Sequence, residues 1–407
     1  MDLQTNISYK KRIFWFFPVL FCFCLPFGSL LLSGMIVLWT LSSFLVVEKQ
    51  QFLKGVKSPW FILLTGFLLL TAFSALFSLN REEALFNIEN KLSFILFPYL
   101  IFCFDWSPQI LKKCVTSFVS GCFFACLFLI VRAFYFYSQG NPDSFFYNQF
   151  SYFVHPSSFS MYLILAVCLA SIYYPQWFGA VKMYTYITYI YIALFCVTIF
   201  LNSSKIGLIS AFICFPILIF YKWREKLNLK RGLALVAGII LLLFVSIKLF
   251  PGPFERFEAV LHFSSANIDK TSSESTTVRY LIWEQCIEII KNNFFFGVSV
   301  GDVTDVLVKA YQQNGMTGAL EHRLNAHSQF FQTFVGLGFI GFVLLFGFTF
   351  FALIRAFVKK NIILSIFLIY IILNFSVESM LQRSDGTLFF VFFFCFFNRE
   401  KIYEELA

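Results

Sequence analysis

Long apolar runs alternate with short polar stretches along the whole chain. A membrane-spanning helix needs roughly 17 to 25 mainly apolar residues, so the pattern predicts about twelve spans. They lie near residues 13–28, 30–47, 59–79, 92–106, 114–136, 158–175, 183–201, 206–222, 232–250, 328–354, 361–377 and 386–398. We therefore expect an all-α, polytopic integral membrane protein.

The longest polar stretch, 251–327, divides the chain into three predicted parts. Residues 1–250 hold transmembrane helices 1–9, residues 251–327 form a large loop outside the membrane, and residues 328–407 hold transmembrane helices 10–12. Two amphipathic helices are expected in the loop. In the first, Val278, Leu281, Ile282, Cys286, Ile289 and Ile290 recur at helical spacing, opposite Glu284, Glu288 and Lys291. The second starts after Asp302, a good N-cap, and stops at Gly315.

Basic residues cluster at the ends of the apolar runs, and their placement predicts the orientation. If the N-terminus is cytoplasmic and the sides alternate, about 19 of the 31 Lys and Arg residues fall inside. The inside clusters are Lys10 to Arg12; Lys49, Lys54 and Lys57; Lys112 and Lys113; Lys222, Arg224, Lys226, Lys230 and Arg231; and Arg355, Lys359 and Lys360. We therefore expect a multi-pass membrane protein with both termini cytoplasmic and the long loop on the outer side.

Composition supports a membrane location and excludes several functions. The chain is 59% hydrophobic and 13% charged, against about 25% charged in soluble domains. The net charge of +9 follows the ends of the spans, so we predict no nucleic acid partner. Ten of the eleven cysteines lie in or beside apolar runs as small hydrophobes, and Cys286 in the loop has no evident partner. No phosphate-binding glycine loop, metal-ligand cluster or serine nucleophile elbow is present, which predicts no cofactor and no metal.

Ionisable residues near the membrane are costly and tend to mark function. On the predicted outer face these are His155, Lys205, Arg279 and His327. Lys205 follows Asn202, Ser203 and Ser204 in a very short turn between two spans, where a half-buried cation needs an anion. The alternative interpretation is a lysine that extends its charged end to the interface and marks a helix end.

Arg279 falls in the first turn of the predicted amphipathic helix, where the helix dipole disfavours a cation. The planar guanidinium suits a phosphate, and Trp283 one turn later can stack against it or against a sugar. A solvated arginine on a surface helix is the alternative.

Two histidines are candidates for proton transfer or substrate binding. His327 follows Asn325, which we expect to cap the next membrane helix, so the imidazole would lie at the bilayer surface and activate a hydroxyl group. His155 precedes Pro156, which favours an extended conformation. For both, a histidine that only forms a hydrogen bond at the interface is the alternative.

From about residue 183 to 358 the order of these features resembles the O-antigen ligase and O-antigen polymerase superfamily. The resemblance is carried by Asn202-Ser203-Ser204-Lys205, by Arg279 with Trp283, Gly297 and Gly301, and by Leu324-Asn325-Ala326-His327-Ser328-Gln329 with Phe331-Gln332, Gly338 and Gly341. His155-Pro156-Ser157 with Ser160-Met161-Tyr162 is also similar to the family. The N-terminal half matches only in its number of helices and its hydropathy.

The resemblance implies a metal-independent, inverting glycosyltransferase of the bacterial inner (cytoplasmic) membrane, with the long loop 251–327 in the periplasm. Such an enzyme transfers a glycan from undecaprenyl diphosphate to an acceptor hydroxyl, here expected to be on lipid A core oligosaccharide. Lys205 and Arg279 would bind the diphosphate, His327 and Arg279 would be catalytic, and His155, Trp283 and Asn325 are possible substrate-binding residues. Lys205 replaces the family's usual arginine, and Phe296 stands where a proline is expected before Gly297.

Two other functions remain open from the sequence. A polymerase of the same superfamily would use another carrier-linked repeat unit as acceptor. A lipid-linked glycan transporter or flippase would also suit about twelve helices, although such carriers typically show repeated halves and polar groups at the midplane. No internal repeat is visible in the sequence.

Overall fold

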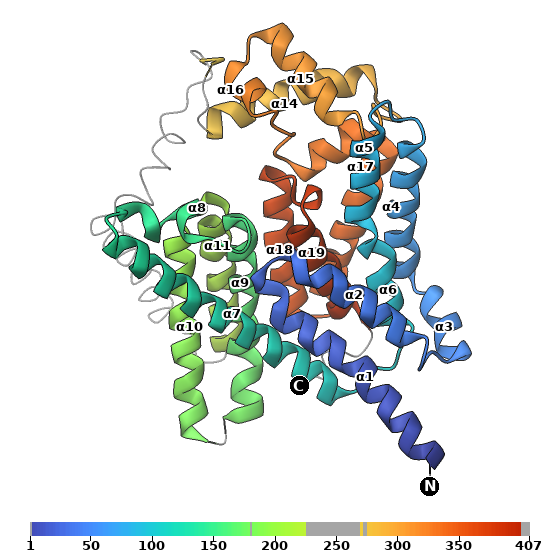
Figure 1. Cartoon of the computed structure of the whole chain (residues 1–407), viewed down its shortest axis with the longest axis vertical. Helices are drawn as coiled ribbons and strands as arrows, with labels where there is room; N and C mark the ends of the chain where they lie inside the picture. The colour runs from blue at the N-terminus through green and yellow to red at the C-terminus, as the bar shows by residue number, and fades with distance from the viewer. Residues whose placement is uncertain (1, 180, 225–268, 272–274, 400–407) are drawn as a thin grey trace.

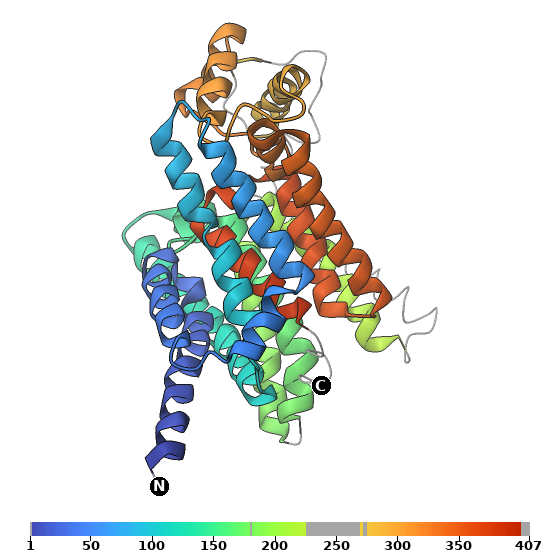
Figure 2. The same cartoon turned by 90° about the vertical axis from the view of Figure 1, so that its right-hand side faces the viewer.

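The computed structural model describes residues 2–179, 181–224, 269–271 and 275–399, and within them it contains helices and no strand. The helices form an elongated bundle with a three-helix layer, α14 to α16, at one end and the start of α1 at the other (Figures 1 and 2). The predicted all-α class is confirmed for the described part of the chain.

The bounds of the helices are as follows. The first part of the chain holds α1 (Asp2–Cys24), η1 (Leu25–Phe27), α2 (Ser29–Ser43), α3 (Lys49–Val56), α4 (Pro59–Ala75), α5 (Arg81–Lys91), α6 (Ser93–Phe102) and α7 (Pro108–Ser138). Next come η2 (Pro142–Phe145), α8 (Tyr147–Phe150), α9 (Pro156–Phe178), α10 (Lys182–Asn202) and α11 (Lys205–Trp223). The remainder holds α14 (Ser275–Asn292), α15 (Val303–Asn314), α16 (Thr317–Glu321), α17 (Gln329–Val358), α18 (Ile362–Val377), η3 (Met380–Gln382) and α19 (Ser384–Asn398).

Every predicted span that falls on described residues coincides with a helix, and the span near 232–250 lies outside them. By length and composition, 6 described helices can cross a membrane, or up to 7 if the bent pair α3 and α4 counts as one span. Leu31–Ser43, α18 and α19 are shorter apolar helices. The protein is therefore consistent with a polytopic membrane protein, while the count of about twelve spans, the periplasmic loop and the boundaries of the three parts stay predictions.

The bundle is apolar both inside and outside. At the centre of the bundle lies α9, which is almost wholly buried. It packs against α7, α10, α11 and α18. Residues 385–398 of α19 are buried throughout, and half of them are phenylalanine. Large apolar side chains such as Phe73, Val131 and Phe351 are more than half exposed on the outer helices. An apolar exterior around an apolar core is what a lipid solvent requires.

Two of the helices that the sequence analysis did not predict, α3 and α5, are not apolar runs. α3 is amphipathic, and α5 carries Glu82 and Glu83 in its first turn and Lys91 in its last turn. This order of charges complements the helix dipole. The side chain of Asn80 caps α5 by accepting the Glu83 backbone N–H. The Asn80 cap and the order of charges therefore favour a helix at α5, in a stretch where the search for apolar spans predicted only a connection.

The three-helix layer contains the two amphipathic helices predicted in the loop, here α14 and α15. Val278, Leu281, Ile282, Cys286 and Ile289 are buried, whereas Glu284, Glu288 and Lys291 are exposed. The buried side chains share one apolar cluster with residues of α15, α16 and the first turns of α17. The predicted helical periodicity is confirmed, and Cys286 packs as a small hydrophobe.

The predicted N-cap at Asp302 is only half right. Asp302 stands at the N-cap position of α15, but its side chain does not cap that helix. The carboxylate instead accepts the backbone N–H groups of Leu79 at 3.0 Å and Asn80 at 2.8 Å. The Asp302 oxygens that the sequence assigned to capping α15 therefore bind a segment distant in the chain instead. These hydrogen bonds fix the three-helix layer to the start of α5.

α17 is broken at Gly338, where the backbone is left-handed with φ 64°. The break frees carbonyl groups that N–H groups four residues later would otherwise bind. Val298 donates its N–H to Val335 O at 2.8 Å, and Phe339 donates to Phe294 O at 2.8 Å. Gly297, also left-handed with φ 70°, lets the two backbones approach this closely. The segment after α14 is therefore bound into the break by main-chain hydrogen bonds.

We predict that Gly338→Ala destabilises the protein by about 1–3 kcal/mol, since alanine is strained in the left-handed region and its Cβ would clash with the Phe295 carbonyl group. Gly347→Ala in the same helix is the matched control, because nothing lies within 4 Å of the added Cβ. Thermal unfolding in detergent should show a lower melting temperature only for Gly338→Ala. Equal melting temperatures for the two variants would contradict the role assigned to the break.

Candidate functional site

The turn that carries Lys205 is held against the start of α9. Ser203 is left-handed with φ 50°, and the Ser204 hydroxyl caps α11 by accepting the Gly207 N–H. The Asn202 side-chain amide donates to Pro156 O and to Ser160 Oγ. Lys205 is therefore set at the first position of α11 by a two-residue turn, beside the segment that carries His155.

Lys205 and Arg279 flank the first turn of α14. Lys205 Nζ donates to Thr276 Oγ1 at 3.1 Å. Thr276 lies three residues before Arg279, so both project from the same face of the helix. Two cations far apart in the chain thus approach one helix start.

Arg279 forms an ion pair with Glu378, the residue that follows α18. Arg279 Nη2 lies 2.8 Å from Glu378 Oε1, and their side chains are 20% and 19% exposed. Among the described residues Arg279 Nε has no hydrogen-bond partner. The pair therefore uses only part of the guanidinium fork and joins the three-helix layer to the membrane bundle.

The loop that carries His327 is held by side chains on its backbone. Trp283 Nε1 donates to Ala326 O at 3.0 Å, and Ala326 N–H donates to Gln332 Oε1 at 3.1 Å. His327 N–H donates to Asn325 Oδ1 at 3.0 Å, and His327 itself is left-handed with φ 44°. The imidazole is thus presented from a fixed backbone.

Asn325 does not cap α17, contrary to the sequence prediction. Ser328 is the N-cap: its hydroxyl accepts the Phe331 N–H and donates to Phe375 O on α18. Asn325 turns back to the His327 N–H because the loop needs that donor satisfied within its own tight turn. The ring of Trp283 lies tilted against Phe331, so Trp283 supports the His327 loop directly.

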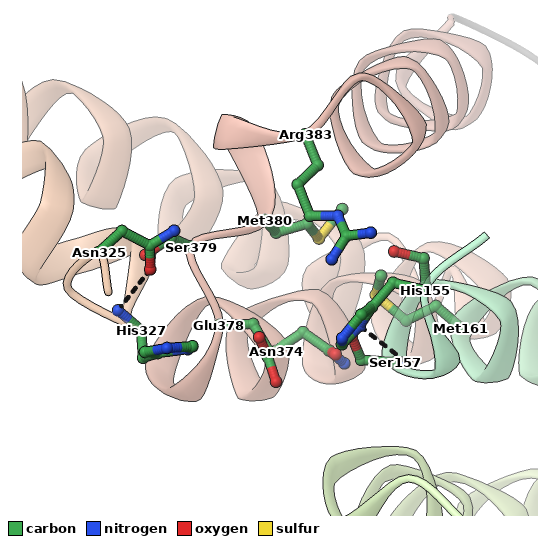
Figure 3. Close-up of a pocket in the computed structure, with 11 residues that line it drawn as sticks. His155, Ser157, Met161, Asn325, His327, Asn374, Glu378, Ser379, Met380 and Arg383 are labelled. Atoms are coloured by element: carbon green, nitrogen blue, oxygen red, sulfur yellow. Dashed lines mark hydrogen bonds between the residues drawn. The ribbon is translucent and has the colours of Figure 1, made fainter. Parts of the chain in front are cut away.

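A polar pocket of about 90 Å³ brings α9, the His327 loop and the α18–α19 connection together. It is lined by His155, Ser157, Ser158, Met161, Asn325, His327, Asn374, Glu378, Ser379, Met380 and Arg383. Figure 3 shows His327 and Glu378 on one side of the pocket, His155 with Ser157 on the other, and the Arg383 side chain reaching toward the space between them. The pocket therefore brings a guanidinium, a carboxylate and two imidazole groups within one small volume.

Several polar groups of the pocket can form further hydrogen bonds. Asn374 Oδ1 and Ser379 Oγ are buried, and neither has a hydrogen-bond partner among the described residues. Buried polar atoms of this kind cost free energy unless a ligand or water satisfies them. Arg383 lies 3.5 Å from Asp385, yet its side chain is 49% exposed. The pocket thus offers acceptors in its interior and a cation near the surface.

Both pocket histidines are held neutral. Burial, followed by the charge of Arg383, lowers the pKa of His155 to about 4. Burial, followed by Arg279, lowers the pKa of His327 to about 4. His155 Nδ1 lies 2.6 Å from Ser157 Oγ, and the backbone N–H of Ser157 donates to the same nitrogen at 3.4 Å. At neutral pH the histidines therefore act as hydrogen-bonding groups rather than cations.

The structure brings most of the predicted site residues together. His155, Asn325 and His327 line the pocket, and Arg279 reaches it through Glu378. Lys205 lies beside α14 rather than in the pocket lining. The sequence interpretation missed Glu378, Arg383 and Asn374. Glu378 and Arg383 carry the same signal as Lys205, an ionisable residue in a short connection between two apolar runs.

The fold and the pocket together define a polytopic helical membrane protein with a polar site toward the end that carries the three-helix layer. Residues 190–346 match the family model O-antigen ligase (Wzy_C), a family of glycosyltransferase-like membrane enzymes. The match agrees with the resemblance to the O-antigen ligase superfamily that the sequence motifs indicated. It includes Lys205, Arg279 and His327, whereas His155 and Glu378 lie outside it. No curated protein matches the chain.

We predict that the pocket histidines make stability depend on pH. Their folded-state pKa of about 4 lies below the ordinary value of 6.5, so the unfolded state binds more protons between these values. Stability should be greatest above pH 6.5 and should fall as the pH drops toward 4. Melting temperatures in detergent at pH 7.5 and 5 measure this loss.

His155→Gln and His327→Gln should each reduce the loss between pH 7.5 and 5. His322→Gln, which alters an exposed histidine at the end of α16, is the control and should retain it. The assignment is contradicted if all three variants lose as much stability as the unaltered protein.

Proposed function

We propose that the protein is an O-antigen ligase-like glycosyltransferase. It transfers a glycan from undecaprenyl diphosphate to an acceptor hydroxyl, with lipid A core oligosaccharide as the acceptor, on the periplasmic face of the bacterial inner membrane. The observation that carries the proposal is the meeting of Lys205, Arg279 and His327 around α14 and the pocket, from three distant segments of the chain.

Lys205 and Arg279 are suited to a diphosphate. A cation pair at one helix start stabilises the negative charge that develops as the carrier diphosphate leaves. Arg279 supplies directed N–H donors, whereas Lys205 supplies a point charge. Arg279 donates to Glu378 through Nη2, and its Nε has no hydrogen-bond partner among the described residues. The guanidinium can therefore bind phosphate oxygens without a change in the conformation of α14.

His327 serves the acceptor side. A neutral imidazole on a fixed loop can orient a sugar hydroxyl or accept its proton as the oxygen attacks the anomeric carbon. Attack from the face opposite the diphosphate inverts the configuration. This chemistry uses the side chains of the pocket, as expected of a nucleotide-independent and metal-independent transferase of the superfamily.

The arrangement of the chain supports an outward-facing site. In the alternating orientation predicted from the basic residues, His155, Lys205, Arg279, His327 and the connection 378–383 all fall on the periplasmic side. The structure gathers these same segments. The start of α1 lies at the end opposite the three-helix layer (Figure 1), as a cytoplasmic N-terminus and a periplasmic loop require.

We predict that the purified protein transfers glycan from a synthetic undecaprenyl diphosphate donor to lipid A core. Arg279→Ala and His327→Ala should each lower the rate by about 10²–10³-fold, because each removes a group that stabilises or positions the reacting atoms. Lys291→Ala and His322→Ala, at exposed positions nearby, should keep the rate of the unaltered protein. Product analysis by mass spectrometry measures the transfer.

The same assay separates the other functions. Longer carrier-linked glycan with an unmodified core would identify a polymerase. Donor that changes sides in vesicles while its chemistry stays the same would identify a transporter or flippase. Either result would replace the ligase proposal.

We further predict that Lys205→Arg keeps donor binding and transfer, since arginine retains the charge and adds a bidentate fork. Lys205→Met, of similar length but neutral, should raise the donor KM and lower transfer by about 10²-fold. Kinetics over a range of donor concentrations distinguish the two variants. Equal activity of Lys205→Arg and Lys205→Met would show that the charge of Lys205 has no part in diphosphate binding.

A further inference from the structure

We propose that Glu378 is the base that accepts the proton of the acceptor hydroxyl, and that Arg279 keeps it neutralised until a donor diphosphate is bound. This inference rests on the proposed glycosyltransferase function and assigns the proton transfer to a residue outside the segment matched by the family model. His327 then orients the acceptor rather than deprotonating it.

The position of Glu378 fits both parts of this role. Its side chain lines the pocket, and its backbone N–H donates to Asn374 O at 2.8 Å, which fixes it as the C-cap of α18. Arg279 donates one hydrogen bond to Glu378 Oε1, rather than the two parallel bonds of a full arginine–carboxylate pair. The remaining carboxylate oxygen and the remaining guanidinium donors are therefore open to two different substrate groups.

The charged and titratable groups around Glu378 favour it over the histidines as the base. It is faced by Arg279 from α14, by Arg383 from the α18–α19 connection, and across the pocket by His155 and His327. Burial raises the pKa of Glu378 above its ordinary value of 4.5, although Arg279 and Arg383 oppose this. Burial lowers the pKa of both histidines to about 4. Burial therefore makes the Glu378 carboxylate a better proton acceptor than an exposed glutamate and makes the two imidazoles poorer acceptors, which favours Glu378 as the base.

A bound donor makes Glu378 more basic still. The diphosphate competes for the guanidinium of Arg279, and a carboxylate that loses its neutralising cation binds a proton more readily. Deprotonation of the acceptor is thus coupled to the presence of the donor. Without a donor, the ion pair keeps Glu378 a weak base.

The transfer step balances in these terms. The acceptor O–H proton passes to the Glu378 carboxylate while the acceptor oxygen forms a bond to the anomeric carbon. The bond from that carbon to the diphosphate oxygen breaks, and its electron pair leaves with the carrier, whose charge Arg279 and Lys205 stabilise. When the carrier diphosphate departs, Glu378 releases its proton to water and Arg279 returns to the carboxylate.

Two unpartnered polar atoms beside Glu378 suit a sugar acceptor. Asn374 Oδ1 comes from the last turn of α18 and Ser379 Oγ from the connection that follows it, and both are buried at the pocket. Each can form a hydrogen bond with a sugar hydroxyl next to the one that reacts. The α18–α19 connection is thus the acceptor half of the site, and α14 with Lys205 is the donor half.

We predict opposite effects of Glu378→Gln on donor binding and on turnover. The amide cannot take the proton, so kcat should fall by about 10²–10⁴-fold. The donor should bind several-fold more tightly, because it no longer competes with a carboxylate for Arg279. A residue with only a structural role would weaken binding and turnover together. Glu288→Gln, an exposed glutamate on α14, is the matched control and should change neither quantity.

A second variant tests the base directly. Glu378→Ala should turn over slowly with the sugar acceptor, but added azide should restore consumption of the donor, because azide is a nucleophile that needs no deprotonation. The expected product is a glycosyl azide of inverted configuration, identified by mass spectrometry and NMR.

The inference is overturned if Glu378→Gln keeps the kcat of the unaltered protein, or if Glu378→Ala binds donor but forms no glycosyl azide. Loss of transfer in His327→Gln together with full transfer in Glu378→Gln would assign the base to His327. If the unaltered protein itself transfers no glycan to any acceptor, the proposed function fails instead, and the two failures are therefore distinguishable.

Discussion

The ion pair between Arg279 and Glu378 is the contact on which the arrangement of the site depends. A binding site for a diphosphate must contain a cation, yet a half-buried cation needs an anion while the site is empty. Glu378 fills that need and at the same time joins α14 to the end of α18. Removing one partner of a buried pair costs about 3–5 kcal/mol, and these side chains, about one-fifth exposed, should lie below that range. The pair thus joins the two parts of the structure and, under the proposed function, holds the place of the substrate's negative charge while the site is empty.

Hydrogen bonds from side chains to the main chain fix other parts of the pocket. Side chains satisfy both the N–H and the C=O of Ala326, and the Gln329 side chain accepts the Leu381 N–H at 2.7 Å. The break at Gly338 fixes the segment after α14 through main-chain hydrogen bonds. Catalysis by preorganised groups needs this rigidity, because the groups that surround developing charge must already be in place.

The sequence predicts those parts of the structure that follow from local periodicity. Helices occupy every described span, since lipid forces long apolar runs into helices, and the buried face of α14 follows from helical spacing. Asp302 and Asn325 were misassigned as caps because tertiary or tight-turn partners took their oxygens. Glu378 belongs to no motif, and only the fold shows that it meets Arg279, 99 residues earlier.

The pocket also depends on the order in which the chain enters the membrane. Synthesis starts at the N-terminus, and segments fold as they emerge. The lining runs from His155 to Arg383, and Arg383 directly precedes α19. A nascent chain that has completed α9 and α14 still lacks the carboxylate and the arginine of the last connection. Under the proposed function, activity can therefore arise only after nearly every helix is in place, so incomplete chains in the bilayer would not consume the carrier.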